Sequence, residues 1–203
     1  MLRFRPRFCR PELTLVPDNL ADAETRGPGL TPLFPSSADL ALEIEAPSGK
    51  TLSASDPALP GLIAGDQLNA SELTIIRSDR AITDCRPISL LATRTIDEIG
   101  RAVGLTLDKR RFRENLYVDL DCGEGFAEDA FVGRRLRIGP KLTVHILERD
   151  IRCRMIGIDP VTLDENPEIL RYVARNQDNT AGVYAAVLVA GLVRPGDEIV
   201  LHD

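Results

Sequence analysis

A cysteine flanked by two arginines is the pattern in this sequence with the clearest chemical potential. In the stretch DIRCRMIGIDP, residues 150–160, Cys153 lies between Arg152 and Arg154. Neighbouring guanidinium groups favour the thiolate, which is the form of cysteine that attacks electrophiles and binds metals. Free cysteine is also among the residue types most often buried in a core. The local sequence therefore leaves two interpretations open, a reactive or metal-binding thiol and a packed one.

Basic residues gather in three short clusters of an otherwise acidic chain. The clusters are KRRFR at 109–113, RRLR at 134–137 and RDIRCR at 149–154, whereas the formal net charge of the protein is −6. A negative net charge disfavours binding of nucleic acid over the whole surface, so we expect no nucleic-acid partner. Clusters of this kind are usually solvated faces, but two that converge would form a pocket for a small anion or a phosphate.

Length and composition predict a soluble, compact protein. The chain has 203 residues, 43% of them hydrophobic and 28% charged, which suits one large domain or one domain with a smaller appendage. Four dispersed cysteines form no C-x-x-C pair, and two histidines are too few for a histidine-based metal site. No apolar run approaches the roughly 18 residues that span a bilayer, and no secretory signal is visible. We therefore expect no membrane partner and a cytoplasmic location.

The first part of the chain predicts little regular structure. Residues 1–37 are rich in proline and arginine and are expected to form an extended arm. Alternating apolar residues at 40–44, the turn signal PSGK at 47–50 and the residues after it predict a β-hairpin. The stretch ELTIIRS at 72–78 predicts another short strand.

The second part predicts many short strands and two helices. The stretch RTIDEIGRAVGLTLD at 94–108 predicts a helix, with Thr95 and Glu98 as a capping box and Gly104 as the residue that ends it. A second is expected over 166–176, capped by Asn166. Because strands outnumber helices without a repeating βαβ pattern, the fold class predicted is mainly β with peripheral helices (α+β). The strands are expected at 115–121, 135–139, 141–148 and 154–159, with two more either side of the RPGD turn at 194–197.

An ordered series of motifs resembles the MOSC domain, the module found at the C-terminus of molybdenum cofactor sulfurases and in amidoxime reductases. The matching blocks, in order, are DCRPISLL at 84–91, RFREN at 111–115, FAEDAFVGRRLRIG at 126–139, RCRMIGIDPVT at 152–162 and AGVYAAVLVAGLVRPGDEI at 181–199. Five blocks in order over about 120 residues are far more specific than any one of them. The resemblance implies a MOSC-type twisted or closed β-barrel over residues 84–203. Residues 38–83 resemble the end of the β domain that precedes MOSC in longer relatives.

The resemblance gives Cys153 a role. In the amidoxime-reductase members, the cysteine of this block is the protein ligand to molybdenum, and the pterin dithiolene supplies other sulfurs. Carried over, this makes Cys153 the catalytic and metal-ligating residue of a molybdopterin-type molybdenum cofactor. A soft thiolate suits such a thiophilic metal. The alternative left open is a MOSC fold that has lost the cofactor, with Cys153 packed.

The RFREN block implies two further cofactor-binding residues. Arg113 and Asn115 match family positions that contact the pterin or its phosphate. Arginine offers a two-pronged donor to phosphate, and asparagine offers a donor and an acceptor to a pterin edge. For Arg113 a salt bridge with Glu114 is the competing interpretation.

Other blocks imply the remaining cofactor-binding residues. Arg152 matches a position that contacts the cofactor beside the metal ligand, and Tyr184 matches a tyrosine near the cofactor, although a strand tyrosine is more often core. Cys85 and Arg86 match positions near the phosphate. The acidic pair at 128–129 is expected to brace the fold.

The chain departs from the family pattern at three places. Glu114 stands where the family has proline, and Ile151 stands where a small polar residue is usual. The lysine–serine pair with which reductase relatives grip the phosphate is not found in residues 1–40. These departures bear on how tightly a cofactor would be bound.

Two functions follow from the resemblance. The first is an oxidoreductase that reduces small N-hydroxylated substrates at molybdenum, with electrons from a separate donor protein, because the chain has no cysteine spacing for an iron–sulfur cluster and no flavin-type glycine-rich loop. The second is a non-catalytic carrier or binding module for the cofactor or for sulfur. No pyridoxal phosphate is expected, since none of the three lysines lies in a matched block.

Overall fold

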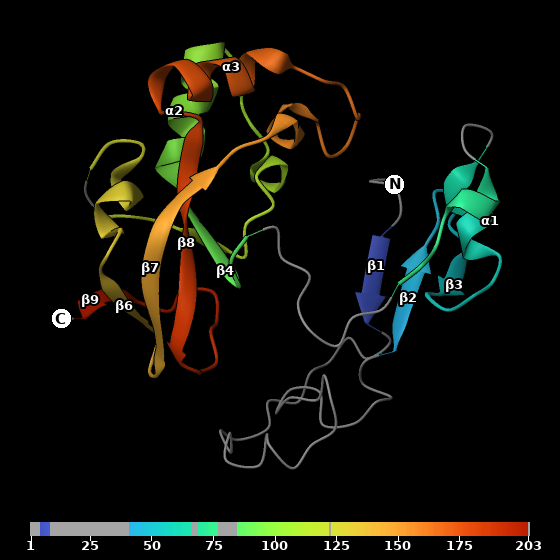
Figure 1. The fold of residues 1–203 in the computed structure, drawn as a ribbon, viewed down its shortest axis with the longest axis horizontal. Helices are drawn as coiled ribbons and strands as arrows, with labels where there is room; N and C mark the ends of the chain where they lie inside the picture. The colour runs from blue at the N-terminus through green and yellow to red at the C-terminus, as the bar shows by residue number, and fades with distance from the viewer. Residues whose placement is uncertain (1–4, 9–40, 66–68, 77–84, 122, 203) are drawn as a thin grey trace. The chain divides into compact units, whose positions relative to one another are not determined.

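The computed structural model describes residues 5–8, 41–65, 69–76, 85–121 and 123–202, and the chain divides into two units (Figure 1). The first unit is Met1–Ile82 and the second is Thr83–Asp203. Each unit is described by itself below.

The first unit contains a small antiparallel sheet. Its strands are β1 (Arg5–Phe8), β2 (Leu42–Glu45) and β3 (Thr51–Ser53), in the order β1-β2-β3, followed by the helix α1 (Leu59–Ala64) and the 3₁₀ turn η3 (Ala70–Glu72). The predicted hairpin is confirmed as β2 and β3, with Glu45 opposite Thr51. Gly49 occupies the turn with φ +82°, a conformation that glycine adopts without steric cost.

Two predictions for this unit are wrong where the structure describes them. Residues 1–37 were expected to lack regular structure, yet Arg5–Phe8 form a strand against β2, while residues 1–4 and 9–37 lie outside the described part. The strand expected at 72–78 is absent from 73–76, and 77–78 are not described. Ile75 and Ile76 are exposed there, so their β propensity is not matched by a partner strand that buries them.

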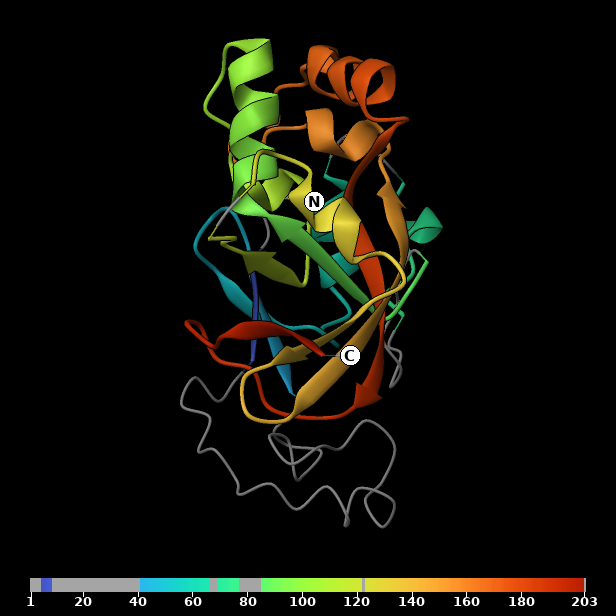
Figure 2. The same cartoon turned by 90° about the vertical axis from the view of Figure 1, so that its left-hand side faces the viewer.

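The second unit is built on a twisted six-stranded sheet (Figures 1 and 2). Every neighbouring pair is antiparallel except β4 and β5, which are parallel. The two longest strands, β7 and β8, lie side by side at the centre, and irregularities of register along them bend the sheet. In the order of hydrogen bonding the strands are β5 (Leu116–Val118), β4 (Ile88–Ala92), β8 (Thr180–Val189), β7 (Leu142–Ile151), β6 (Arg135–Ile138) and β9 (Ile199–His202).

Helices gather at one end of this sheet. The helices α2 (Thr93–Val103) and α3 (Pro167–Asn176) pack against each other beyond the end of β7 and β8, as both views show. Three 3₁₀ turns complete the unit: η4 (Lys109–Arg111), η5 (Ala127–Phe131) and η6 (Arg154–Gly157).

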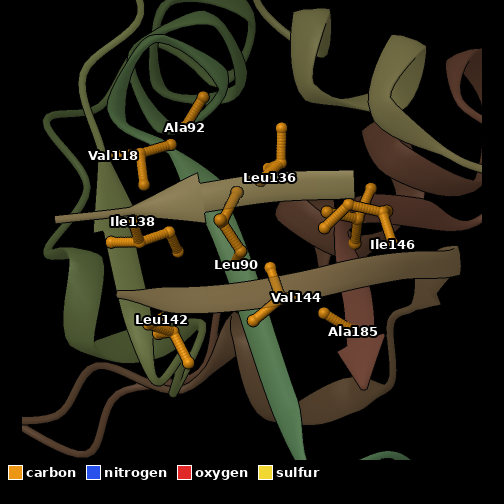
Figure 3. Close-up of a cluster of buried hydrophobic side chains, with 10 residues drawn as sticks. Leu90, Ala92, Val118, Leu136, Ile138, Leu142, Val144, Ile146 and Ala185 are labelled. Atoms are coloured by element: carbon orange, nitrogen blue, oxygen red, sulfur yellow. The ribbon is translucent and has the colours of Figure 1, made fainter. Parts of the chain in front are cut away.

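The core has two parts because β4 presents alternate side chains to opposite faces. Leu90 belongs to a cluster enclosed by the curled sheet (Figure 3), and Leu91 to a cluster between the sheet and the helices. Figure 3 labels Leu90, Ala92, Val118, Leu136, Ile138, Leu142, Val144, Ile146 and Ala185 of the first cluster. The prediction of a mainly β fold with peripheral helices is confirmed.

Some of the predicted helix ends are confirmed, whereas the predicted capping box and one predicted strand are wrong. Asn166 caps α3 by accepting a hydrogen bond from the Glu168 amide (2.9 Å), and Gly104 ends α2 in the left-handed conformation, as expected. The capping box at the start of α2 is not formed, because Thr95 lies inside the helix and its hydroxyl donates to Glu128. The strand expected at 154–159 is instead the turn η6, closed by hydrogen bonds of 3₁₀ spacing.

Candidate functional site

Cys153 is a free, exposed cysteine at the point where the chain leaves β7 and enters η6. Both backbone polar groups of the preceding residue, Arg152, are hydrogen-bonded to Asn179. The Arg152 amide donates to the Asn179 carbonyl (2.8 Å), and the Asn179 side-chain amide donates to the Arg152 carbonyl (2.9 Å). The backbone next to the thiol is therefore fixed to the residue that precedes β8, and Cys153 itself is exposed to solvent.

Arg152 points into the protein, where its guanidinium meets two buried carboxylates. It forms ion pairs with Glu114 and, at 3.1 Å, with Asp150. Its Nε donates to the Ala181 carbonyl (2.7 Å) and its Nη1 to the Phe112 carbonyl (3.1 Å). The expected contact with a cofactor would have to use the little donor capacity that these bonds leave.

The glycine of the AGVY block makes room for this arginine. Gly182 has φ +84°, and a Cβ atom there would lie 2.8 Å from the Leu90 carbonyl oxygen and 3.1 Å from Nη2 of Arg152. Any other residue would displace the strand or the guanidinium, so glycine is required by close packing as well as by conformation.

A second buried arginine, which sequence reasoning did not single out, ties the same two motif blocks together. Arg111 donates from Nη1 to the Gly157 carbonyl (3.0 Å) and pairs through Nη2 with Asp159 (2.5 Å). Asp159 also accepts from the amides of Val161 and Thr162, and these bonds hold its pKa below the ordinary value. Arg111 and Arg152 thus fasten the block at 109–115 to the block at 152–159.

Arg113 is exposed and has a left-handed backbone, with φ +59°. The salt bridge with Glu114 that the sequence left open is not formed, because Glu114 pairs with Arg152 instead. Within the described residues, Arg113 has no ion-pair partner. Its guanidinium is therefore available to an external anion.

Asn115 is anchored to β4. Its Oδ1 accepts from the Ser89 backbone amide (2.9 Å) and from the Ser89 hydroxyl (3.3 Å), and the backbone amide of Asn115 donates to that hydroxyl (3.2 Å). These bonds orient the side chain and leave its amide NH₂ as the group able to donate to a ligand.

A row of polar side chains crosses three neighbouring strands beside these residues. Ser89 of β4 lies opposite Tyr184 of β8, which lies opposite Glu148 of β7. Glu148 in turn receives Nε of Arg86 (2.8 Å) and the thiol of Cys85 (3.7 Å). We call Ser89, Tyr184 and Glu148 the polar row; it brings Tyr184, Arg86 and Cys85, all expected cofactor-binding residues, to one region of the sheet.

The electrostatics of the region differ from the sequence expectation. The positive charges on both sides of Cys153 are compensated, since Arg152 pairs with Glu114 and Asp150, and Arg154 pairs with Glu165 at 2.7 Å. Burial raises the pKa of Glu114, with Arg152 acting in the opposite direction.

Tyr184 stays a neutral donor at ordinary pH. Burial raises the pKa of Tyr184, and the negative charge of Asp150, to which its hydroxyl is hydrogen-bonded, raises it further. The tyrosine hydroxyl therefore stabilises the ionised form of Asp150.

The acidic pair of the FAEDAF motif braces the fold, as expected. Glu128 is buried and accepts from the Thr95 hydroxyl (2.8 Å) and the Ala92 amide (3.3 Å) at the start of α2. Asp129 lies 3.7 Å from Arg149 of β7. Both groups fix η5 to its surroundings.

Together, the fold and the site define a β-rich module that presents one exposed thiol next to an anchored arginine–carboxylate cluster. The model of the MOSC domain matches residues 77–200, so the chain belongs to the MOSC domain family. This family is associated with binding of the molybdenum cofactor.

Comparison with solved structures gives a distant neighbour. The crystal structure of YiiM from Geobacillus stearothermophilus is 19% identical, with a TM-score of 0.46. The match covers 58% of this chain and 55% of that one, so the chain spans about half the length of that protein. A search of curated proteins gave no significant match.

Residues 5–8, 41–65, 69–76, 85–121 and 123–202 contain no helix long and apolar enough to cross a bilayer. The same part of the chain contains no group of three or more His, Cys, Asp or Glu side chains able to hold a metal ion.

Proposed function

We propose that the chain binds a molybdenum cofactor through Cys153 and reduces the N–O bond of small N-hydroxylated substrates, with electrons from a separate donor protein. The observation that carries the proposal is the exposed, free thiol of Cys153 on a backbone anchored by Asn179. A soft sulfur donor in a fixed position suits a thiophilic metal such as molybdenum. When bound, the cofactor would supply the two-electron chemistry of oxygen removal.

The protein residues have distinct parts in this proposal. Cys153 holds the metal, and Arg113 with the Asn115 amide binds the phosphate and pterin edge. Arg152 has its donors engaged by Glu114, Asp150 and two carbonyls, so we assign it to positioning the cysteine loop, residues 152–154, rather than to contacting the cofactor. The donor set thus fits a phosphorylated pterin with a thiophilic metal.

Metal analysis tests the binding step. Protein purified from a molybdenum-replete host is expected to hold molybdenum, and Cys153→Ala to lose most of it. Val161→Ala, at an exposed position of the loop that follows η6, is the matched control and should retain the metal. An equal molybdenum content in wild type and Cys153→Ala would show that Cys153 is not the metal ligand.

A carrier function is the second candidate, and a specific observation favours it. Because both flanking arginines are paired with carboxylates, they offer little positive charge to activate a bound group for turnover. Incubating metal-loaded protein with a simple amidoxime and an artificial reductant separates the two functions. Formation of the amidine supports the reductase, whereas retention of molybdenum without product supports the carrier.

A further inference from the structure

Two carboxylates and one guanidinium are buried together beneath the cysteine loop. The side chains of Glu114, Asp150 and Arg152 are exposed by only 0%, 3% and 7%. We call these three residues the carboxylate–arginine cluster. If all three were ionised, the cluster would bury a net negative charge, and an uncompensated buried charge is strongly unfavourable.

The hydrogen bonds identify which carboxylate is the less suited to carry that charge. Asp150 receives both Arg152 and the Tyr184 hydroxyl. Glu114 receives Arg152 on Oε1, but its buried Oε2 has no hydrogen-bond partner among the described residues. A bare oxygen on an ionised, buried carboxylate is particularly costly, whereas protonation removes the charge and keeps the bond to Arg152 through the carbonyl oxygen.

We propose that the carboxylate–arginine cluster is a proton-binding site in which Glu114 keeps its proton at pH values where an ordinary glutamate is ionised, and Asp150 is the ionised partner of Arg152. The cluster is then electrically neutral. The Ser89 hydroxyl interacts with the Glu114 carboxyl in favour of its ionised form, so it opposes this protonation.

The surroundings of Glu114 favour the protonated form. Burial raises the pKa of Glu114 and the negative charge of Asp150 adds to this, while Arg152 and Ser89 lower it. The other titratable groups facing it are neutral phenols: Tyr117 accepts a hydrogen bond from the Glu114 amide, and Tyr184 lies beyond Asp150. Arg113, the adjacent residue, is exposed to solvent.

The proton site is also coupled to cofactor binding, and this coupling rests on the proposed function. Glu114 lies between Arg113 and Asn115, the two residues proposed to bind the phosphate-bearing cofactor. An ionised Glu114 would place negative charge beside that anion, so cofactor retention should weaken as pH rises and Glu114 loses its proton. By linkage, binding of the anionic ligand must favour proton uptake by the same amount.

Carboxyl NMR of the full chain, without any ligand, tests the proton site. In protein labelled with ¹³C at the glutamate carboxyl, we expect a signal with a titration midpoint above the ordinary glutamate value of 4.5, absent from Glu114→Gln. Glu165→Gln, which removes the exposed partner of Arg154, should leave that signal in place. A Glu114 signal that titrates at or below 4.5 overturns the proposal.

A second variant keeps the test independent of how well Glu114→Gln folds. Ser89→Ala removes a hydroxyl that lowers the pKa of Glu114, so the midpoint of the same signal should move further up. No movement, or movement down, would contradict the proposed network.

The coupling to the cofactor has its own measurement. Molybdenum retained after incubation over a pH series should fall in wild type across the titration of Glu114 and stay level in Glu114→Gln. Parallel losses in both proteins overturn the coupling. Absence of molybdenum at every pH overturns the proposed function and the coupling with it, while the NMR titration decides the proton site by itself.

Discussion

Arg152 connects Phe112, Glu114, Asp150 and Ala181, which come from different segments of the second unit. Its burial has a consequence for the neighbouring residue. Because successive residues of an extended chain point to opposite sides, an inward Arg152 directs Cys153 outward to solvent. The arginine thus determines where the thiol lies without touching it.

Replacing Arg152 by methionine should therefore be costly. It leaves the ionised Asp150 buried without a counter-ion and removes the hydrogen bond to Glu114, and we expect the free energy of unfolding to fall by about 3–5 kcal/mol. All three tyrosines of the chain lie in the second unit and there is no tryptophan, so urea unfolding followed by tyrosine fluorescence reports on this unit alone. Arg154→Met, at a side chain exposed by 77%, is the control and should unfold like wild type. Equal effects of the two substitutions would refute a structural role for the cluster.

Sequence reasoning recovered part of this site. It singled out Cys153, Arg152 and Tyr184 from local motifs, but it assumed that the flanking arginines would act on the thiol. The partners that prevent this are Glu114, which lies 38 residues from Arg152, and Glu165. Such pairings depend on how β5, β7 and η6 meet in three dimensions, and a sequence pattern contains no signal for them.

Elements with strong local signals were predicted well. The helix α3 has a capping asparagine followed by proline, and it begins one residue after the predicted start at 166. The alternation of Leu142, Val144 and Ile146 predicts β7, but the strand continues to Ile151, beyond the predicted end at 148. The segment at 154–159 has strand-like apolar residues, yet residues 154–157 form η6, where Arg111 binds the Gly157 carbonyl. Among the described residues, the strand-like pairing of this segment is limited to the isolated bridge of Ile158 with Glu165. Tertiary contacts decide such short segments.

The close packing of the strand β8 at Gly182 gives a testable prediction. Gly182→Ala adds backbone strain at φ +84° and a Cβ atom too close to the Leu90 carbonyl, so we expect a loss of about 3 kcal/mol in the free energy of unfolding. Gly196→Ala is a matched control, since Gly196 has φ +90° but nothing within 4 Å of an added Cβ. It should lose only about 1 kcal/mol, from the backbone strain alone. Losses of the same size in both variants would show that the close approach of β8 contributes nothing.

At the scale of the whole second unit, buried carboxyl groups set the pH dependence of stability. Burial raises the pKa of Glu114, Glu128 and Asp129 in the folded state, while hydrogen bonds lower the pKa of Asp108 and Asp159. Groups with a raised pKa hold protons more tightly in the folded state. Their contribution to the free energy of unfolding is therefore complete below the ordinary pKa and is lost as pH rises through the raised value. Groups with a lowered pKa act in the opposite direction, and their contribution to the free energy of unfolding is lost as pH falls through the lowered value.

Glu128 isolates the first effect, because it is buried at the start of α2 and far in sequence from the proposed ligand residues. Glu128→Gln resembles the protonated acid in shape, so its free energy of unfolding should match wild type near or below the ordinary glutamate pKa of 4.5. As pH rises above 4.5, the folded wild type holds a proton that the unfolded chain has released, so wild-type stability falls with pH and the variant gains on it. Tyrosine-detected urea unfolding at several pH values measures the difference, with the exposed Glu168→Gln as control. A difference that is constant with pH would mean that Glu128 is ionised in the folded protein as readily as in the unfolded chain, and that Thr95 and the start of α2 fully offset its burial.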